Sequence, residues 1–263
     1  MAQALTPIRE QVYRDSRPAE HFDRFHARTR TREPDAVYEA VRWSTSLYAF
    51  VCFRLRGLSS EKVPQAGPVI LAPNHFSFMD HFFVGAALRR KVHFMAKSQL
   101  FKPPMQFVYT HGGVFPVRRG ARDEEAFVTA AAVLARGGCM AMYCEGGRSR
   151  TGQLADRPRP GIGRLALQSG AAIVPVAVHG SQRVRNWKRF QFPVVTVQYG
   201  DPIRWAPVEE PTRDQQQAVA EAILAEIRTL YSGLDRLGRR DVRARLRAEQ
   251  RRRHSTGKRA APA

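Results

Sequence analysis

A histidine and an aspartate five residues apart form the pair best suited to proton transfer. His75 and Asp80 follow an apolar run that ends at Pro73. Facing side chains in a regular helix lie three or four residues apart. The two can therefore meet if His75 lies in a turn and Asp80 in the first turn of the next helix, which we expect Ser77 to cap. A neutral imidazole could then take a proton from a hydroxyl, while the carboxylate fixes its tautomer and stabilises the imidazolium.

Such a base requires no serine or cysteine nucleophile if the substrate hydroxyl itself attacks an activated acyl group. An alternative interpretation of the same residues is purely structural. In it, Ser77 and Asp80 only cap a helix, and His75 is an ordinary loop residue. His81 adjoins Asp80, but we expect its side chain to point elsewhere on the helix.

Two further segments combine glycine with arginine. The first, 112–119, is a Gly-Gly pair, an apolar run and the pair Arg118-Arg119. The second, 144–150, reads Cys-Glu-Gly-Gly-Arg-Ser-Arg. Arginine suits forked contacts with phosphate oxygens, and glycines let the backbone approach a ligand closely. The alternatives are a solvated strand end for the first segment and a plain glycine turn for the second.

Short apolar runs, each about the length of a buried strand, precede these segments and recur along the chain. They are Val69–Ala72, Val92–Ala96, Val114–Val117, Cys139–Cys144, Ile173–Val178 and Val194–Tyr199. Helical patterns lie between several of them, at His81–Arg89, Asp123–Arg136 and Ile162–Ser169, and a long helix is expected from Thr212 through Tyr231, with Gln215 as a capping partner. The alternation predicts an α/β fold with a mostly parallel central sheet flanked by helices.

The three polar segments each follow a predicted strand. In a parallel sheet the carboxyl ends of the strands lie along one edge, where α/β proteins place their functional loops. We therefore expect a base beside a phosphate site. The predicted organisation is an extension over 1–34, one domain over 35–235 and an Arg-rich tail over 236–263 that is either a frayed helix or disordered.

Charge is the outlying feature of the composition. The 263 residues include 43 Lys and Arg against 23 Asp and Glu, a net charge of +20. The tail alone holds eleven Lys and Arg and two acids. This excess predicts an anionic partner, which could be nucleic acid, a membrane surface or a phosphorylated substrate. Three scattered cysteines are too few for a disulfide framework or a zinc site, so we expect a reducing, cytoplasmic setting.

The apolar segment Trp43–Phe53 lies between Arg42 and Arg54 in a helical pattern that begins at Asp35. It has about half the roughly 18 apolar residues of a spanning helix. Aromatic residues with flanking arginines suit a bilayer interface, so we expect an N-terminal interfacial helix. The alternative is a helix packed on the core. We also expect no secretory signal, because the polar start lacks an apolar region.

The polar segments together resemble the glycerolipid acyltransferase family. Its first block is Asn-His, four residues and Asp, matched by Asn74, His75 and Asp80. Its second ends in an arginine, matched by Arg119, although Arg118 replaces an acidic residue common there. The third, Pro-Glu-Gly-Thr-Arg-Ser, reads here as 144–149 with Cys and Gly replacing Pro and Thr. The fourth is a proline in an apolar strand, matched by Pro175.

The resemblance covers roughly residues 68–180 and implies an acyltransferase. Acyl-CoA or an acyl-carrier protein would be the donor, and 1-acyl-glycerol-3-phosphate the favoured acceptor, without metal or cofactor. It implies His75 as the base and Asp80 as its partner. The residues implied to bind the substrate are Asn74, Arg119, Glu145, Gly146, Gly147, Arg148 and Pro175.

A lysophospholipid acceptor, an anionic membrane surface and a peripheral place on the cytoplasmic side of the cell membrane fit this interpretation. Alternatives within the family are another lysophospholipid or glycolipid acceptor, or an altered member that only binds lipid. A nucleic-acid-binding protein is a remote alternative, because the sequence has neither a known reading motif nor aromatics interleaved with basic residues on one face.

Overall fold

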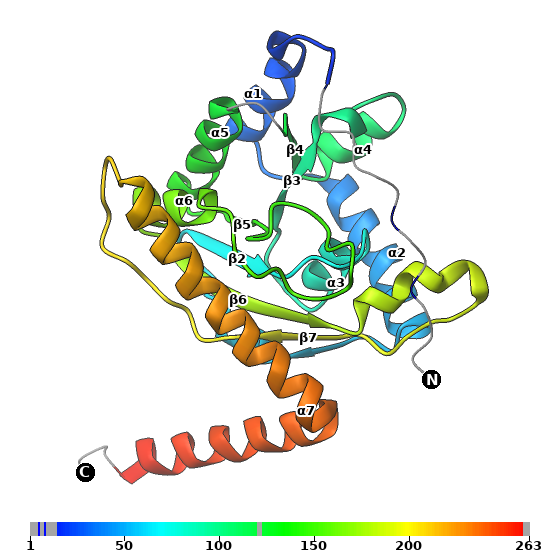
Figure 1. The fold of residues 1–263 in the computed structure, drawn as a ribbon, viewed down its shortest axis with the longest axis vertical. Coiled ribbons are helices and arrows are strands. Elements are labelled where there is room, and N and C mark those ends of the chain that lie inside the picture. The colour runs from blue at the N-terminus through cyan, green and yellow to red at the C-terminus, as the bar shows by residue number, and fades with distance from the viewer. Residues whose placement is uncertain (1–4, 6–7, 9–14, 120–122, 260–263) are drawn as a thin grey trace.

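A seven-stranded sheet forms the centre of the protein in a computed structural model, which describes residues 5, 8, 15–119 and 123–259. The strands are β1 (Arg56–Leu58), β2 (Val69–Pro73), β3 (His93–Lys97), β4 (Val114–Val117), β5 (Cys139–Ala141), β6 (Ala172–His179) and β7 (Thr196–Tyr199). Their order is β1-β7-β6-β2-β5-β3-β4 (Figure 1). Neighbours are parallel except β6 and β7. The predicted α/β fold is confirmed.

Seven α-helices surround the sheet in the described part of the chain. They are α1 (Asp23–Thr31), α2 (Ala36–Cys52), α3 (Asp80–Ala86), α4 (Met105–His111), α5 (Glu124–Ala135), α6 (Gly161–Ser169) and α7 (Arg213–Arg259). Several begin where the sequence predicts. Asp123 caps α5 by accepting from the Ala126 amide, and Thr212 and Gln215 exchange the two hydrogen bonds of a capping box at α7.

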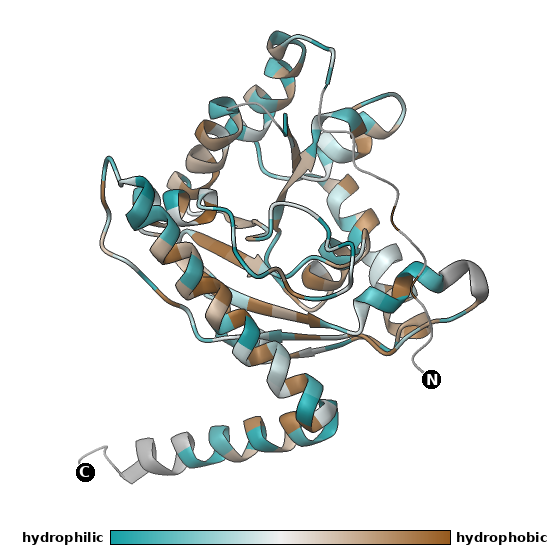
Figure 2. Cartoon of the chain, viewed as in Figure 1, coloured by the Kyte–Doolittle hydropathy of each residue, from teal (hydrophilic) through white to brown (hydrophobic). Residues whose placement is uncertain are grey.

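The alternating side chains of the strands divide the core into two layers, and the central strands β2 and β6 are mainly brown, that is hydrophobic, in Figure 2. In β2, Val69 and Leu71 pack into the layer that includes residues of α2 and α3. Ile70 and Ala72 pack on the opposite face, with residues of α5, α6 and α7. β2 thus lies fully buried between two helical layers, and its carboxyl end carries the His75 loop.

The described part of the predicted extension, residues 1–34, packs on the rest of the described chain. Phe22 and Phe25 are buried and form a small core with Phe101, whose ring centroid lies 5.1 Å from that of Phe25. The His26 and Thr129 side chains hydrogen bond at 2.8 Å, joining α1 to α5. Phe22 and Phe25 stand among many charged residues in this segment, so its sequence shows no helical apolar pattern.

The Arg-rich tail is largely helical. Helix α7 continues beyond the predicted domain boundary and is interrupted at Gly238, where φ is 73° and ψ is 164°. Figure 1 shows the chain changing direction at this kink and the last part of α7 projecting from the sheet. Val242 is buried and Leu246 packs beside it. The tail is therefore attached to the domain by an apolar contact near its start.

Candidate active site

The polar segments lie at the carboxyl ends of parallel strands, as the sequence predicts. His75 follows β2, Arg119 follows β4 and the turn at 142–150 follows β5. These strands belong to the parallel set β2-β5-β3-β4. His75, Arg119 and Arg148 line one cavity of about 640 Å³. The structure thus brings together three residues that are separated by up to 73 positions in the chain.

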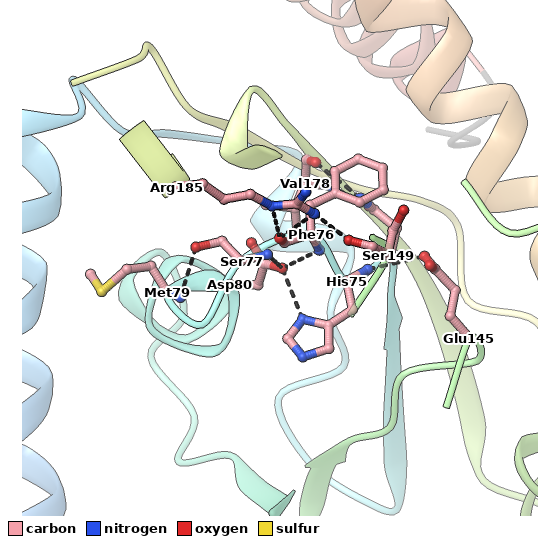
Figure 3. Close-up of polar contacts among 10 residues, drawn as sticks. His75, Phe76, Ser77, Met79, Asp80, Glu145, Ser149, Val178 and Arg185 are labelled. Carbon is pink, nitrogen blue, oxygen red and sulfur yellow. Dashed lines mark hydrogen bonds and ion pairs between the residues drawn. The ribbon is translucent and has the colours of Figure 1, made fainter. Parts of the chain in front are cut away.

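The His75 and Asp80 side chains hydrogen bond at 2.9 Å between Nδ1 and Oδ2 (Figure 3). Because a carboxylate accepts, Nδ1 donates and Nε2 carries the lone pair. Asp80 is fully buried, and its Oδ2 also accepts from the amides of Phe76 and Ser77 at 2.6 and 2.7 Å. These bonds fix the carboxylate, which in turn fixes the imidazole.

The turn between the two residues is locally encoded. Ser77 Oγ accepts from the Met79 amide at 3.1 Å, and Asp80 accepts from the Ser77 amide. Helix α3 itself begins at Asp80, and its N-cap is Met79, which makes no side-chain cap hydrogen bond. The predicted cap at Ser77 is therefore replaced by a turn ahead of the helix, in which Asp80 bonds both to the Ser77 amide and to His75.

The imidazole of His75 is covered by an aromatic ring that the sequence analysis did not identify. Tyr143 stacks on it with centroids 3.9 Å apart and an interplanar angle of 21°. Burial lowers the pKa of His75, and the hydrogen bond to Asp80 offsets part of that effect. The ring is therefore neutral at pH 7, as a general base must be.

Asn74 and Glu145 attach the His75 loop to neighbouring parts of the chain. The Asn74 side chain donates to the Val178 carbonyl at 3.1 Å and accepts from the Val178 amide at 2.7 Å. Glu145 Oε1 accepts from the His75 amide at 3.0 Å. Burial raises the pKa of Glu145 to about 7. Both residues were predicted to bind substrate, and in this structure their contacts position the loop.

The glycines after Glu145 shape a tight turn. Gly146 has φ +70°, and a Cβ there would lie 2.8 Å from Arg159 Cγ, so both conformation and space favour glycine. Gly147 leads the chain from this turn to Arg148. Among the described residues no ion pair joins Glu145 to Arg148, and the Arg148 side chain lines the cavity instead.

A third cation lies with the two predicted arginines. Lys97 ends β3 and lines the cavity with Arg119 and Arg148. Burial lowers the pKa of Lys97, and the charges of Arg148 and Arg119 lower it further. Lys97 could have been predicted as a site residue from its position at the carboxyl end of a predicted strand.

The rest of the cavity is mainly apolar and lies between α2, α3, α4 and β3. Its lining includes Tyr38, Val41, Thr45, Phe78, Phe82, Ala86, Phe94, Met95, Met105, Val108 and Val114. His81 also lines it, so its side chain shares the cavity with His75, contrary to the expectation that it points elsewhere. Burial lowers the pKa of His81 to about 4, which keeps this ring neutral.

Pro175 is the one predicted site residue that lies in the middle of a strand. It pairs with Ala72 within the sheet, and its carbonyl accepts from the Gly200 amide at 2.8 Å. It is not among the residues lining the cavity. Its predicted part in substrate binding stays a prediction. In the part of the chain that the structure describes, no group of three His, Cys, Asp or Glu could hold a metal ion.

The part of the chain that carries these residues is similar to a known family. Residues 55–179 match the family model described as Acyltransferase. The fold is similar to the crystal structure of the 1-acyl-sn-glycerophosphate acyltransferase from Thermotoga maritima, with a TM-score of 0.57 and 19% identity over 80% of this chain and 88% of that one. The stretch that matches this family model covers a little under half of the chain, and the likeness to the solved structure is one of fold.

Among its relatives are two bacterial glycerol-3-phosphate acyltransferases. That of Aeromonas hydrophila is 29% identical over 51% of this chain, and that of Xanthomonas campestris pv. campestris is 28% identical over 62%. These matches cover only 19% and 20% of the two relatives. The chain thus corresponds to about a fifth of the length of each.

Proposed function

We propose that the protein transfers a fatty acyl group from a thioester carrier to the free hydroxyl of 1-acyl-glycerol-3-phosphate, which forms phosphatidic acid. The observation that carries this proposal is the His75–Asp80 pair, 2.9 Å apart, at a cavity that three cations also line. The donor is acyl-CoA or an acyl-carrier protein, and no residue of the chain is acylated in the reaction.

The proposed reaction uses the lone pair of His75. Nε2 takes the proton of the acceptor hydroxyl as its oxygen bonds to the thioester carbonyl carbon. The tetrahedral intermediate collapses, the C–S bond breaks, and the thiolate leaves with the proton from the imidazolium. Asp80 stays ionised and stabilises that imidazolium. The products are one new ester and one free thiol, and the base is regenerated.

Charge and polarity support the placement of the two substrates. Lys97, Arg119 and Arg148 would bind the acceptor phosphate, because charge-assisted hydrogen bonds to phosphate are strong. The apolar walls from α2, α3 and α4 would bind the acyl chain of the donor. Each buried CH₂ contributes about 0.8 kcal/mol, so a cavity of about 640 Å³ favours a long chain.

A peripheral site of action on an anionic membrane is part of the proposal. No helix in the described part of the chain has the length and apolar character needed to cross a bilayer. Helix α2 exposes Trp43, Leu47, Phe50 and Val51, which share one face at i, i+4, i+7 and i+8. Such a face binds the interface of a bilayer, on the cytoplasmic side where anionic lipids attract basic segments.

Arginines gather near the end of that face. Arg239 of α7 donates to the Arg54 carbonyl at 2.7 Å. Burial lowers the pKa of Arg239, and the charges of Arg56, Arg54, Arg243 and Arg240 lower it further. This arginine cluster (54, 56, 239, 240 and 243) would bind lipid phosphates next to the apolar face.

Glycerol 3-phosphate is a second candidate acceptor, because the bacterial relatives are named for it. The same base and cations would serve it. Purified protein would be given acyl-CoA or acyl-carrier protein with 1-acyl-glycerol-3-phosphate, glycerol 3-phosphate, other lysophospholipids or a glycolipid, and thiol release would be measured.

His75→Ala should lower the rate by about 10² to 10⁴, whereas His21→Ala, an exposed control, should not. Activity of His75→Ala within tenfold of wild type would reject the base. If none of the acceptors on the panel supported thiol release, acyl transfer would be rejected and a family member that only binds lipid would be favoured.

A further inference from the structure

The Arg185 side chain connects the two loops that carry the proposed base and the proposed phosphate ligand. It comes from the 3-10 helix Ser181–Arg189, which follows β6. Its Nε and Nη2 donate to the Phe76 carbonyl at 3.3 and 3.2 Å. Its Nη1 donates to the Arg150 carbonyl at 2.8 Å, and Nη2 also donates to the Ser149 carbonyl. Figure 3 shows the guanidinium between the Phe76 and Ser149 backbones.

These acceptors lie next to the residues that the proposed reaction uses. Phe76 follows His75, and Ser149 follows Arg148. The two loops touch directly through the Ser149 amide, which donates to the His75 carbonyl at 2.8 Å, and through the Glu145 bond to the His75 amide. Arg185 adds a planar group that holds both backbones at a set separation, which a flexible ammonium cannot do.

We propose that Arg185 is a positioning residue that fixes the distance between the base on His75 and the phosphate site at Arg148. This inference rests on the proposed function. A base and a bound acceptor must be aligned closely, and a displacement of about 1 Å can cost about 10²-fold in rate. Arg185 is placed to prevent such a displacement, because it bonds to the backbone immediately after each of the two residues.

Arg90 provides a matched control. It is also partly buried and also bonds to carbonyls, those of Pro64 at 2.9 Å, Gly67 at 2.9 Å and Gly137 at 2.5 Å. These lie just before β2 and β5, at the edge of the sheet opposite the site. Replacing Arg90 therefore removes a similar number of hydrogen bonds between the same two strands without touching the two loops.

The first measurement is hydrogen exchange in full-length protein, which requires no activity. In Arg185→Ala the amides of 76–80 and of 145–149 should both lose protection, and in Arg90→Ala neither should. Unchanged protection in either loop would overturn the inference, whatever the outcome of the activity assay.

The second measurement is steady-state kinetics on the acceptor that the wild type uses. Arg185→Ala should lower kcat about 10- to 100-fold with little change in KM for the thioester donor, and Arg185→Lys should recover part of it. Arg90→Ala should keep kcat within twofold. Equal kcat values for the two alanine variants would assign Arg185 a purely structural role. If Arg185→Ala fails to fold, Arg185→Lys decides, since wild-type kcat in that variant would also overturn the inference. An inactive wild type would reject the proposed function, and the exchange result would still stand.

Discussion

At the scale of single residues, the state of His75 depends on two opposing effects. Burial lowers its pKa, and the Asp80 carboxylate raises it. The net direction is down from 6.5, so the neutral base persists to a lower pH than a free histidine would allow. The pH profile of the reaction should reveal this.

We predict that kcat/KM falls on the acid side with a midpoint below 6.5, because activity is lost as His75 is protonated. Glu145 has a pKa of about 7 and could contribute to the same limb, so the profile of Glu145→Gln is the control. The acid limb should remain in that variant. A midpoint at or above 7 that disappears in Glu145→Gln would assign the limb to Glu145 instead.

Glu145 should also make stability depend on pH. Its pKa is raised from 4.5 to about 7 by burial. As pH rises from about 4.5 to 7, the unfolded state ionises first, so stability is lost and the loss is complete above the folded pKa. Glu145→Gln removes this loss while still accepting from the His75 amide. The free energy of unfolding of the variant, relative to that of wild type, should therefore be about 1–3 kcal/mol higher at pH 8 than at pH 5.

Urea unfolding at the two pH values measures the difference. Glu210→Gln, at an exposed position, serves as the control. Its stability difference from wild type should be the same at pH 5 and at pH 8. A Glu145→Gln offset that does not change with pH would contradict the buried carboxyl interpretation.

Arg148 should act on phosphorylated acceptors selectively. Losing a charge-assisted contact to phosphate costs about 1.5–3 kcal/mol, which corresponds to roughly one to two powers of ten in kcat/KM. Arg148→Lys should restore only part, because an ammonium lacks the forked geometry. The exposed neighbour Arg150 offers a matched Arg→Ala control. Equal losses on phosphorylated and unphosphorylated acceptors, with a lowered Tm, would instead indicate that Arg148 only holds the turn.

The site was predictable where chemistry is encoded by spacing along the chain. His75 and Asp80 meet through one local turn, and Arg119 and Arg148 each follow an apolar strand. Lys97, Tyr143, His81 and Arg185 were not predicted. Lys97 and Arg185 come from a neighbouring strand and a distant 3-10 helix. His81 and Tyr143 lie next to predicted segments, but sequence alone does not show which way their side chains point. The substrate roles of Asn74, Glu145 and Pro175 come from the resemblance and stay predictions, and the contacts that these residues make here are with the backbone.

At the scale of elements, continuous apolar runs located six strands. β1 was not predicted, since Arg56-Gly57-Leu58 is short and begins with a charge, and it forms by pairing with β7. β7 itself runs antiparallel to β6, a reversal that no local pattern indicates. Helix α4 was not predicted either, because its seven residues make only about two turns, too few for helical periodicity to be recognised in the sequence.

Helix α2 should determine binding to uncharged bilayers. Trp43→Ser with Leu47→Ser removes two side chains that are 72% and 67% exposed. Burial of each is worth about 1.5–3 kcal/mol when complete, so partition into neutral vesicles should fall at least tenfold. Val128→Ser, at a 50% exposed position on α5, is the control. Unchanged co-sedimentation of the double variant would place the membrane contact elsewhere.

At the scale of the whole molecule, the last part of α7 should add an electrostatic contribution to membrane binding. Arg243, Arg245 and Arg247 are exposed, and each basic residue near an anionic surface contributes about 1 kcal/mol. The triple Arg→Gln variant should bind anionic vesicles more weakly, by up to about two powers of ten. Binding to neutral vesicles and kcat on a water-soluble acceptor should not change.

Salt provides the check, since it screens exposed charges. Wild-type binding to anionic vesicles should weaken with salt, and the triple variant should respond less. Deleting the residues after Gly238 should weaken binding similarly, with an added loss of stability because Val242 is buried. Binding that resists both salt and carbonate would indicate insertion into the bilayer.

Helix α2 lines the cavity with one side and exposes apolar residues on the other, which would link the reaction rate to the composition of a bilayer. Tyr38, Val41 and Thr45 line the cavity, while Trp43, Leu47 and Val51 are exposed on the opposite side of the same helix. If the protein is held at the bilayer by that outer side, its lipid acceptor reaches it by diffusion within the plane of the leaflet. Its rate then depends on the mole fraction of acceptor in the leaflet. Adding inert lipid at constant acceptor would slow the reaction even though nothing new occupies the site.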